Sequence, residues 1–228
     1  MKIVLVTGAN RGMGWQTGCE LSAGGCRVYF GTRGPGVSGE PVKNATGKAS
    51  WLTIDVSDSE SILKASQWLA QRETALDVLI NNSGIYPDQK HSITSISRDQ
   101  LVATFQTNTF GPIEVTQAVL GLLKKSKAAR IINVSSGYGR IDGLSADVPS
   151  YCLSKLALNG VTLMLAEKLK AHRIAVNSVD PGWVRTDMGG SNATRSVAEG
   201  AAGIVWLASQ APHELTGRFF RDGRELGW

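Results

Sequence analysis

Residues 1–14 read MKIVLVTGANRGMG, an apolar run that leads into a turn with glycines at positions 8, 12 and 14. A helical pattern follows from Met13 to Ala23. The glycines permit a tight turn and let an anionic pyrophosphate approach the free N–H groups at the helix N-terminus. A strand, a glycine-rich turn and a helix in this order form the context that a dinucleotide site requires. We therefore interpret the turn as a nucleotide site with contacts from Gly8, Asn10, Arg11, Gly12, Met13 and Gly14, although a purely structural turn is the alternative.

Beyond this turn, short apolar runs alternate with longer amphipathic ones. The predicted strands are Lys2–Val6, Arg27–Gly31, Ser50–Ile54, Asp77–Asn81, Arg130–Val134, Ile174–Val179 and Arg218–Arg221. The predicted helices are Met13–Ala23, Asp58–Gln71, Arg98–Lys124, Pro149–Ala171 and Ser196–Ala208. Alternation of strands and helices indicates an α/β fold, here a doubly wound, Rossmann-type, mostly parallel sheet with helices on both faces. We expect one domain over residues 1–228 that also contains the catalytic site. The glycines and prolines between Gly34 and Ala49 predict that no helix longer than about two turns forms there.

The choice of cofactor depends on the segment Gly31-Thr32-Arg33-Gly34, which follows the second predicted strand. An NAD site would place an acidic residue here for the ribose 2′-hydroxyl, but no acidic residue follows this segment until Glu40. Arg33 can instead make a charge-assisted bond to a 2′-phosphate, and Arg11 in the glycine turn would reinforce it. We therefore expect NADP rather than NAD, with two solvated arginines as the alternative.

A candidate acid/base pair lies in the segment Pro149-Ser150-Tyr151-Cys152-Leu153-Ser154-Lys155. Tyr151 and Lys155 are four residues apart at the start of a helical pattern, so they share one helix face. An ammonium group beside a phenol favours the phenolate, and we expect Lys155 to lower the pKa of Tyr151. Tyr86 and Lys90 have the same spacing, but Pro87 places them in a loop, which we interpret as surface. Cys152 points about 100° away from Tyr151 on the helix and is expected to pack rather than react.

Composition excludes several classes of protein. The apolar fraction of 42% is enough for a folded core, which excludes wholesale disorder. The three cysteines, Cys19, Cys26 and Cys152, indicate reduced thiols and a cytoplasmic protein. The net charge of +5 is scattered along the chain, so no nucleic-acid patch is expected. No apolar stretch reaches membrane length, and the three histidines show no metal-ligand spacing, so no membrane partner and no metal are expected.

Several motifs occur together in a familiar order: Thr7–Gly14, Asp55-Val56, Asn81-Asn82-Ser83-Gly84, Asn108, Ser135-Ser136, Tyr151 with Lys155, and Pro181-Gly182. With this set the chain resembles the short-chain dehydrogenase/reductase family, of the single-domain kind, over essentially its full length. Residues 181–188 (PGWVRTDM) and 217–223 (GRFFRDG) look most like the carbonyl-reductase-like branch of that family. The individual motifs are weak, and their combination carries the resemblance.

The resemblance implies roles at the adenosine end of the cofactor. Asp55 and Val56 would meet the adenine, with Asp55 accepting a bond from its amino group; a helix N-cap or turn role is the alternative for Asp55. Asn82, Ser83 and Gly84 would line the adenosine ribose, unless they form an ordinary turn. Ser83 stands where the family usually has alanine, which is a small change.

The resemblance also implies a catalytic set of Asn108, Ser136, Tyr151 and Lys155. Asn108 would open its helix locally and hold a water that relays protons to Lys155, although an exposed helix residue is the alternative. Ser136 would orient the substrate oxygen at the end of its strand. Tyr151 and Lys155 would also contact the cofactor. The turn Pro181-Gly182 would carry the nicotinamide, with Val184 and Thr186 on its carboxamide, while Trp183 and Met188 would wall the substrate side unless Trp183 packs in the core.

These observations predict an NADPH-dependent oxidoreductase that transfers a hydride between nicotinamide and a carbonyl or alcohol, with Tyr151 as general acid/base. A non-catalytic NADP-binding sensor or scaffold on the same fold is the alternative. The expected partner is a small carbonyl or alcohol substrate. The long helices Arg98–Lys124 and Pro149–Ala171 would serve a homodimer or homotetramer, as they commonly do in the family.

Overall fold

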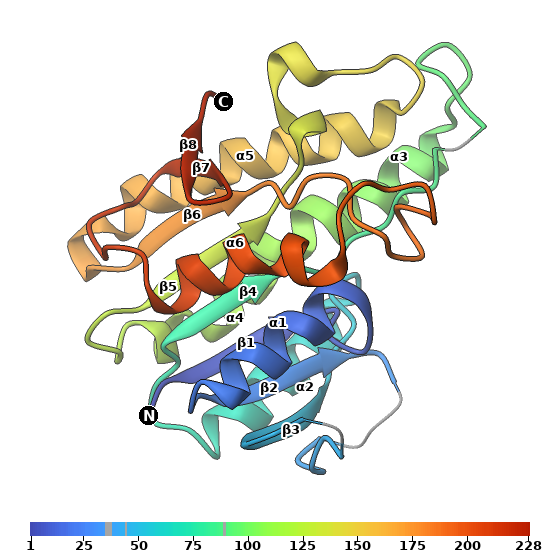
Figure 1. Cartoon of the computed structure of the whole chain (residues 1–228). Helices are drawn as coiled ribbons and strands as arrows, with labels where there is room; N and C mark the ends of the chain where they lie inside the picture. The colour runs from blue at the N-terminus through green and yellow to red at the C-terminus, as the bar shows by residue number, and fades with distance from the viewer. Residues whose placement is uncertain (35–37, 44, 89) are drawn as a thin grey trace.

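A single mostly parallel sheet organises the molecule (Figure 1). The computed structural model describes residues 1–34, 38–43, 45–88 and 90–228. Among these residues an eight-stranded sheet forms in the order β3-β2-β1-β4-β5-β6-β7-β8, and only β8 runs antiparallel to its neighbour. The strands are β1 (Ile3–Thr7), β2 (Arg27–Thr32), β3 (Lys48–Thr53), β4 (Val78–Asn81), β5 (Arg130–Val134), β6 (Ala175–Val179), β7 (Arg218–Arg221) and β8 (Arg224–Leu226).

Helices cover both faces of the sheet, which confirms the predicted doubly wound class (Figure 1). The helices are α1 (Gly12–Ala23), α2 (Ser59–Ala70), α3 (Arg98–Phe105), α4 (Gly111–Leu123), α5 (Pro149–Leu169) and α6 (Val197–Ser209). Helices α1 and α6 lie together on one face, and α2, α4 and α5 lie on the other. No helix within the described ranges is both long and apolar enough to cross a membrane.

The central strands are buried on both faces, which explains their nearly continuous apolar sequences such as IVLVT in β1. One apolar cluster lies under α2, α4 and α5 and includes Leu5, Leu79 and Ile131. A second lies under α1 and α6 and includes Val6, Ile80 and Phe30. Successive side chains along each strand thus alternate between two cores, one on each face of the sheet. Packing on both faces fixes the strands and therefore the positions of their carboxyl ends.

The chain reverses its direction of travel across the sheet between β1 and β4. Strands β2 and β3 are added on one side of β1, and β4 to β7 are added on the other. In open α/β sheets, ligands bind outside the carboxyl ends of the strands at such a switch point. The loops that follow β1 and β4 are therefore the expected location of a binding site.

The predicted helix Arg98–Lys124 is wrong as one continuous element. The structure divides it into α3, a π-helical turn at Gln106–Phe110, and α4. Pro112 gives the physical reason, because a proline has no N–H and its ring clashes with the carbonyl four residues earlier, here that of Asn108. A wider π turn relieves this clash. The turn also buries Asn108 completely, so this residue is not an exposed helix residue.

The C-terminal strand β8 is an element that the sequence argument missed. It pairs with β7 through the two-residue turn Asp222-Gly223, with Arg221 opposite Arg224. Both turn residues have positive φ, 52° for Asp222 and 74° for Gly223, as a tight Asp-Gly hairpin turn requires. The Asp-Gly pair in the sequence was the signal that could have predicted this hairpin.

The region between β2 and β3 agrees with its prediction as far as it is described. None of the residues 34, 38–43 and 45–49 is helical. The remaining part of that prediction, Pro35, Gly36, Val37 and Asn44, lies outside the described residues.

Candidate active site

A cleft of about 650 Å³ opens at the switch point of the sheet. Its lining brings together most of the predicted cofactor residues from five separate loops. They are Gly8, Asn10, Arg11, Gly12, Met13, Gly14, Arg33, Asp55, Val56, Asn82, Ser83, Gly84 and Thr186, with Met188 from the predicted substrate wall. The other predicted cofactor residues, Tyr151, Lys155, Pro181, Gly182 and Val184, are not part of this lining.

The glycine turn has the geometry of an anion site. Gly8 and Gly12 adopt positive φ, 63° and 58°, which side-chain-bearing residues rarely tolerate. Helix α1 begins at Gly12, no side chain caps its N-terminus, and its first turn holds no acidic residue. The first N–H groups of the helix are therefore not occupied by a side-chain cap, and together with the helix dipole they suit a pyrophosphate. The residues present thus fit a dinucleotide.

Gly14 closes the back of this turn and leaves no room for a side chain. A Cβ at this position would lie 2.4 Å from the Gly8 carbonyl oxygen and 2.5 Å from Nδ2 of Asn82. Asn82 Nδ2 itself donates to the carbonyls of Thr7 (2.9 Å) and Gly8 (3.1 Å), so it cannot simply move away.

We therefore expect Gly14→Ala to destabilise the fold by about 1–3 kcal/mol and to weaken cofactor binding, because the glycine turn must shift. Gly121→Ala in α4 is the matched control, since a Cβ there meets no atom within 4 Å. That control should be neutral or slightly stabilising. Thermal unfolding and cofactor titration measure both effects, and an unchanged melting temperature for Gly14→Ala would contradict the close packing.

The part of the cleft that lies after β2 and β3 holds one arginine and one aspartate. Arg33 exposes 75% of its side chain, and its Nη1 lies 4.0 Å from Oδ2 of Asp55. Oδ1 of Asp55 accepts bonds from the N–H (2.9 Å) and hydroxyl (2.7 Å) of Ser57. Oδ1 of Asp55 thus stabilises a local turn, as the sequence analysis allowed, while Oδ2 faces Arg33. Arg33 lines the cleft and is exposed enough to bind an anion.

Arg11 lines the same cleft as Arg33, and its reinforcing role there stays a prediction. Its guanidinium forms an exposed ion pair with Asp187, in the loop after β6. The neighbouring Gly12 also approaches this loop, because a Cβ on Gly12 would lie 3.4 Å from the Thr186 side chain. Arg11 therefore links the glycine turn to the loop after β6 through its ion pair with Asp187.

The π-helical turn places Asn108 between the loop after β4 and helix α5. Its Oδ1 accepts the N–H of Ile85 (2.8 Å), and its Nδ2 donates to the Ile85 carbonyl (2.9 Å) and to Oγ of Ser154 (3.0 Å). This side chain therefore fixes the loop after β4 against α5. An ideal Cβ on Gly84 would lie 3.4 Å from Asn108 Oδ1 and 3.6 Å from Lys155 Nζ, so these groups meet at one point.

Lys155 is buried, and its ammonium donates to the carbonyl of Val134 (2.8 Å) at the end of β5. Burial lowers the pKa of Lys155 to about 8, because the charged form loses its hydration. Its Nζ lies 5.6 Å from the ring centroid of Tyr151. The predicted pair therefore does lie on one helix face.

The electrostatics of Tyr151 correct the sequence argument. Burial raises the pKa of the Tyr151 phenol well above its usual value, although a hydrogen bond with the Ser136 side chain lowers it in part. The negative charge of Asp180 also raises it. Lys155 does not dominate the pKa of Tyr151, since its ammonium bonds to the backbone carbonyl of Val134. The raised pKa favours the protonated phenol of Tyr151, which lies beside Ser136.

Tyr86 is half-buried and contacts Tyr151, so the interpretation as loop surface is wrong. The two rings pack edge to face with centroids 4.9 Å apart, and Tyr138 packs on the same ring at 6.3 Å. Tyr86 does lie in a loop, and Lys90 is exposed. The sequence pattern could not show this contact, because Tyr86 and Tyr151 are far apart in the chain and lie on different elements.

Asp88 is a further residue that the sequence argument missed. It is 0% exposed, and its carboxylate accepts the N–H of Tyr151 (2.8 Å) and the hydroxyl of Ser150. Since no side chain of the preceding residue caps α5, Asp88 supplies the cap from the loop after β4. It thereby fixes the backbone of Tyr151. Cys152, by contrast, is buried packing, as predicted.

The loop after β6 forms the other wall of the site. Gly182 has φ 74°, Val184 is buried, and the hydroxyl of Thr186 donates to the Val184 carbonyl (3.4 Å). Trp183 is 54% exposed and donates from Nε1 to the Gly189 carbonyl (2.8 Å), so it does not pack in the core. Within the described ranges, no three acidic, histidine or cysteine side chains are grouped as a metal site requires.

Comparison with known proteins decides the family. Residues 2–196 match the family model described as short chain dehydrogenase. The chain belongs to the short-chain dehydrogenase/reductase family. This confirms the resemblance seen in the motifs and makes the protein a member of an oxidoreductase family.

Two solved members of this family have the same fold over the whole chain. A carbonyl reductase from chicken fatty liver, solved with NADPH bound, is 29% identical with a TM-score of 0.88, and the match covers 100% of both chains. The carbonyl reductase Sniffer of D. melanogaster is 32% identical with a TM-score of 0.86 and covers 100% of this chain and 99% of that one. A short-chain dehydrogenase of Penicillium roqueforti, anuI, is 34% identical over 99% of this chain and 97% of its own length.

Proposed function

We propose that this protein is an NADPH-dependent carbonyl reductase of the short-chain dehydrogenase/reductase family, and that it also catalyses the reverse alcohol oxidation. The observation that carries the proposal is the meeting of Ser136, Tyr151 and Lys155 beside a cleft whose glycine turn fits a dinucleotide. We assign both the cofactor site and the catalytic set to one domain of residues 1–228.

NADPH, when bound, supplies the hydride that reduces the carbonyl carbon. Tyr151 donates its phenolic proton to the carbonyl oxygen, because burial keeps the phenol protonated at neutral pH. The Ser136 hydroxyl, which bonds to Tyr151, orients the same oxygen. In the reverse direction Tyr151 acts as the phenolate, after its own proton has left along the relay to Lys155, and it then accepts the proton of the alcohol.

Lys155 and Asn108 support this proton transfer. A Lys155 pKa of about 8 lies close to neutral pH, so its ammonium can give up a proton and regain it. We also assign Lys155 a bond to a ribose hydroxyl of the cofactor, which its closeness to Gly84 in the cleft lining supports. Asn108 fixes the loop that carries Gly84, and we assign it to a proton relay that ends at Lys155.

The preference for NADPH is supported by Arg33, an exposed guanidinium that lines the cleft. The chicken relative was solved with NADPH, and so was a blue fluorescent protein from a metagenomic library that is 26% identical with a TM-score of 0.83. Tyr138 packs on Tyr151, and Trp183 and Met188 are exposed in the loop after β6. We assign these three side chains to an apolar substrate side. This surface favours an apolar or aromatic carbonyl compound over a strongly charged one.

The proposal is tested with a panel of aldehydes, ketones and quinones, followed through the loss of NADPH absorbance. We expect turnover with at least one apolar carbonyl and none without NADPH. Tight NADPH binding without turnover on any member of the panel would instead support the sensor or scaffold alternative. Light scattering of the same sample tests the expected homodimer or homotetramer.

A further inference from the structure

A buried carboxylate, Asp180, lies directly before the Pro181-Gly182 turn and has no role in the mechanism above. It is 2% exposed. Its Oδ1 accepts the N–H of Gly182 at 2.8 Å, and its Oδ2 accepts bonds from Nε (2.9 Å) and Nη2 of Arg221. The carboxylate therefore holds the turn with one oxygen and the C-terminal hairpin with the other.

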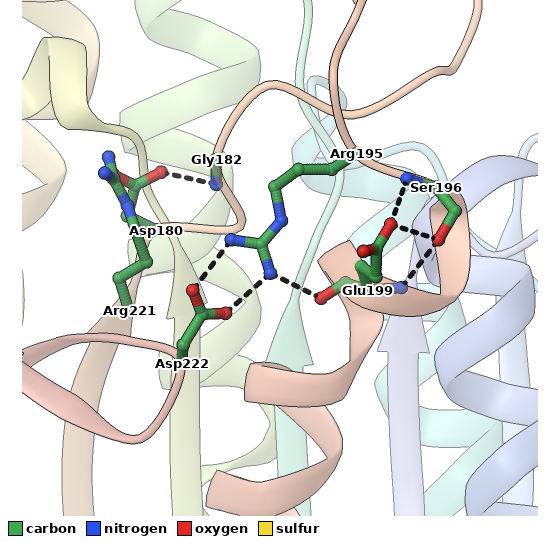
Figure 2. Close-up of polar contacts among 7 residues, drawn as sticks. All are labelled: Asp180, Gly182, Arg195, Ser196, Glu199, Arg221 and Asp222. Atoms are coloured by element: carbon green, nitrogen blue, oxygen red, sulfur yellow. Dashed lines mark hydrogen bonds and ion pairs between the residues drawn. The ribbon is translucent and has the colours of Figure 1, made fainter.

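A second ion pair reaches the same turn from the opposite side. Arg195 bonds to both oxygens of Asp222 at 2.9 and 2.6 Å, and to the Glu199 carbonyl at 3.0 Å. A Cβ on Gly182 would lie 2.7 Å from Cδ of Arg195, so this side chain packs directly on the turn. Figure 2 shows the Gly182 turn between the Asp180–Arg221 pair and Arg195.

Both ion pairs use adjacent residues of the hairpin formed by β7 and β8. Arg221 is the last residue of β7, and Asp222 begins the two-residue turn that follows. The hairpin is anchored to β6, because the N–H of Asp180 donates to the Phe220 carbonyl at 2.8 Å. The position of the Gly182 turn is therefore set by a hairpin that lies almost 40 residues further along the chain.

The Asp180–Arg221 pair also borders the catalytic edge. A Cβ on Gly137, the residue after Ser136, would lie 3.0 Å from Nη2 of Arg221 and 3.1 Å from Oδ2 of Asp180. The pair thus fills the space between the loop after β5 and the loop after β6. A buried carboxylate without its partner is strongly unfavourable, so loss of Arg221 should force this region to rearrange.

We propose that Asp180 and Arg221 are positioning residues that fix the Gly182 turn for the nicotinamide end of the cofactor. This inference rests on the proposed function, in which that turn receives the nicotinamide. It predicts that breaking the pair weakens contacts at the nicotinamide end and leaves the adenosine end intact, because Arg33 and the glycine turn lie elsewhere in the cleft.

The experiment compares two ligands, NADPH and adenosine 2′,5′-bisphosphate, a fragment that lacks the nicotinamide. Their dissociation constants are measured by calorimetry for the wild-type protein and for Arg221→Met. We expect Arg221→Met to weaken NADPH binding about tenfold or more and to change fragment binding less than about twofold. Arg218→Met is the matched control, since it removes an exposed ion pair with Glu225 from the same hairpin and should change neither constant.

A rescue variant separates positioning from general damage. Asp180→Asn combined with Arg221→Met removes both charges and retains an Oδ1 acceptor for the Gly182 N–H. It should recover NADPH binding to within about threefold of the wild type, since no buried charge is left unpaired. If Arg221→Met does not fold, Arg221→Lys provides the comparison, with the same selective loss for NADPH but a smaller one.

Equal weakening of both ligands, or unchanged NADPH binding, would overturn the inference. Failure of the proposed function gives a different result. Binding of NADPH without any turnover overturns only the proposed reaction, and the ratio of the two constants still decides the role of Asp180 and Arg221. A wild-type protein that binds NADPH no more tightly than the fragment overturns the inference, because the turn then contributes nothing to affinity.

Discussion

Replacing Tyr151 with phenylalanine is expected to reduce turnover by about 10²–10⁴-fold or more while NADPH binding stays within about twofold. The change removes only the hydroxyl, which bonds to Ser136 and which we propose as the proton donor. The ring remains, and with it the edge-to-face contacts to Tyr86 and Tyr138. Single-turnover kinetics and NADPH titration of the same preparation measure the two effects separately.

Tyr86→Phe is the matched control, because it also removes one tyrosine hydroxyl and keeps the ring that packs on Tyr151. We expect its turnover to stay within about threefold of the wild type. Lys155→Met should lose both turnover and some NADPH affinity, since Lys155 serves both. Near-normal rates for Tyr151→Phe, or inactivity confined to Tyr86→Phe, would remove Tyr151 from the mechanism.

Local patterns were sufficient to predict the frame of this molecule. Strand Arg218–Arg221 has the predicted bounds, and the glycine turn lies between β1 and α1 as expected. The reason is that apolar alternation and glycine spacing act over a few residues, so a linear sequence contains them. The cleft then follows from the strand order, because the switch point collects the loops after β1, β2, β3 and β4.

The missed features are contacts between distant parts of the chain. Asp88 caps the helix that carries Tyr151 from 63 positions away, and Arg221 pairs with Asp180 across 41 positions. No periodicity encodes such pairs. The pKa of Tyr151 was predicted in the wrong direction for the same reason, since the helix spacing showed Lys155 but not the burial of the phenol.

The choice of cofactor gives the second large expected effect. The ribose 2′-phosphate carries nearly two negative charges at neutral pH, and Arg33 can meet it with a forked, charge-assisted contact. A hydrogen bond to a charged group contributes about 1.5–3 kcal/mol, which corresponds to roughly ten- to over a hundredfold in affinity. We therefore expect the wild-type protein to favour NADPH over NADH by a factor in this range.

Arg33→Asp should reverse much of this preference. The new carboxylate would repel the 2′-phosphate, joined by Asp55, whose Oδ2 lies 4.0 Å from Arg33 in the wild type. It would also offer an acceptor to the 2′-hydroxyl of NADH. Arg11→Ala should change the preference less, because Arg11 is paired with Asp187.

The measurement is the ratio of kcat/KM with NADPH and with NADH for each variant. Lys125→Asp provides the control for a change of two charges, since Lys125 is exposed just beyond the end of α4 and does not line the cleft. Its ratio should equal that of the wild type, because exposed charges further apart than a Debye length of about 8–10 Å are largely screened. A wild-type protein that favours NADH, or an Arg33→Asp ratio equal to that of Lys125→Asp, would exclude Arg33 as the residue that selects the cofactor.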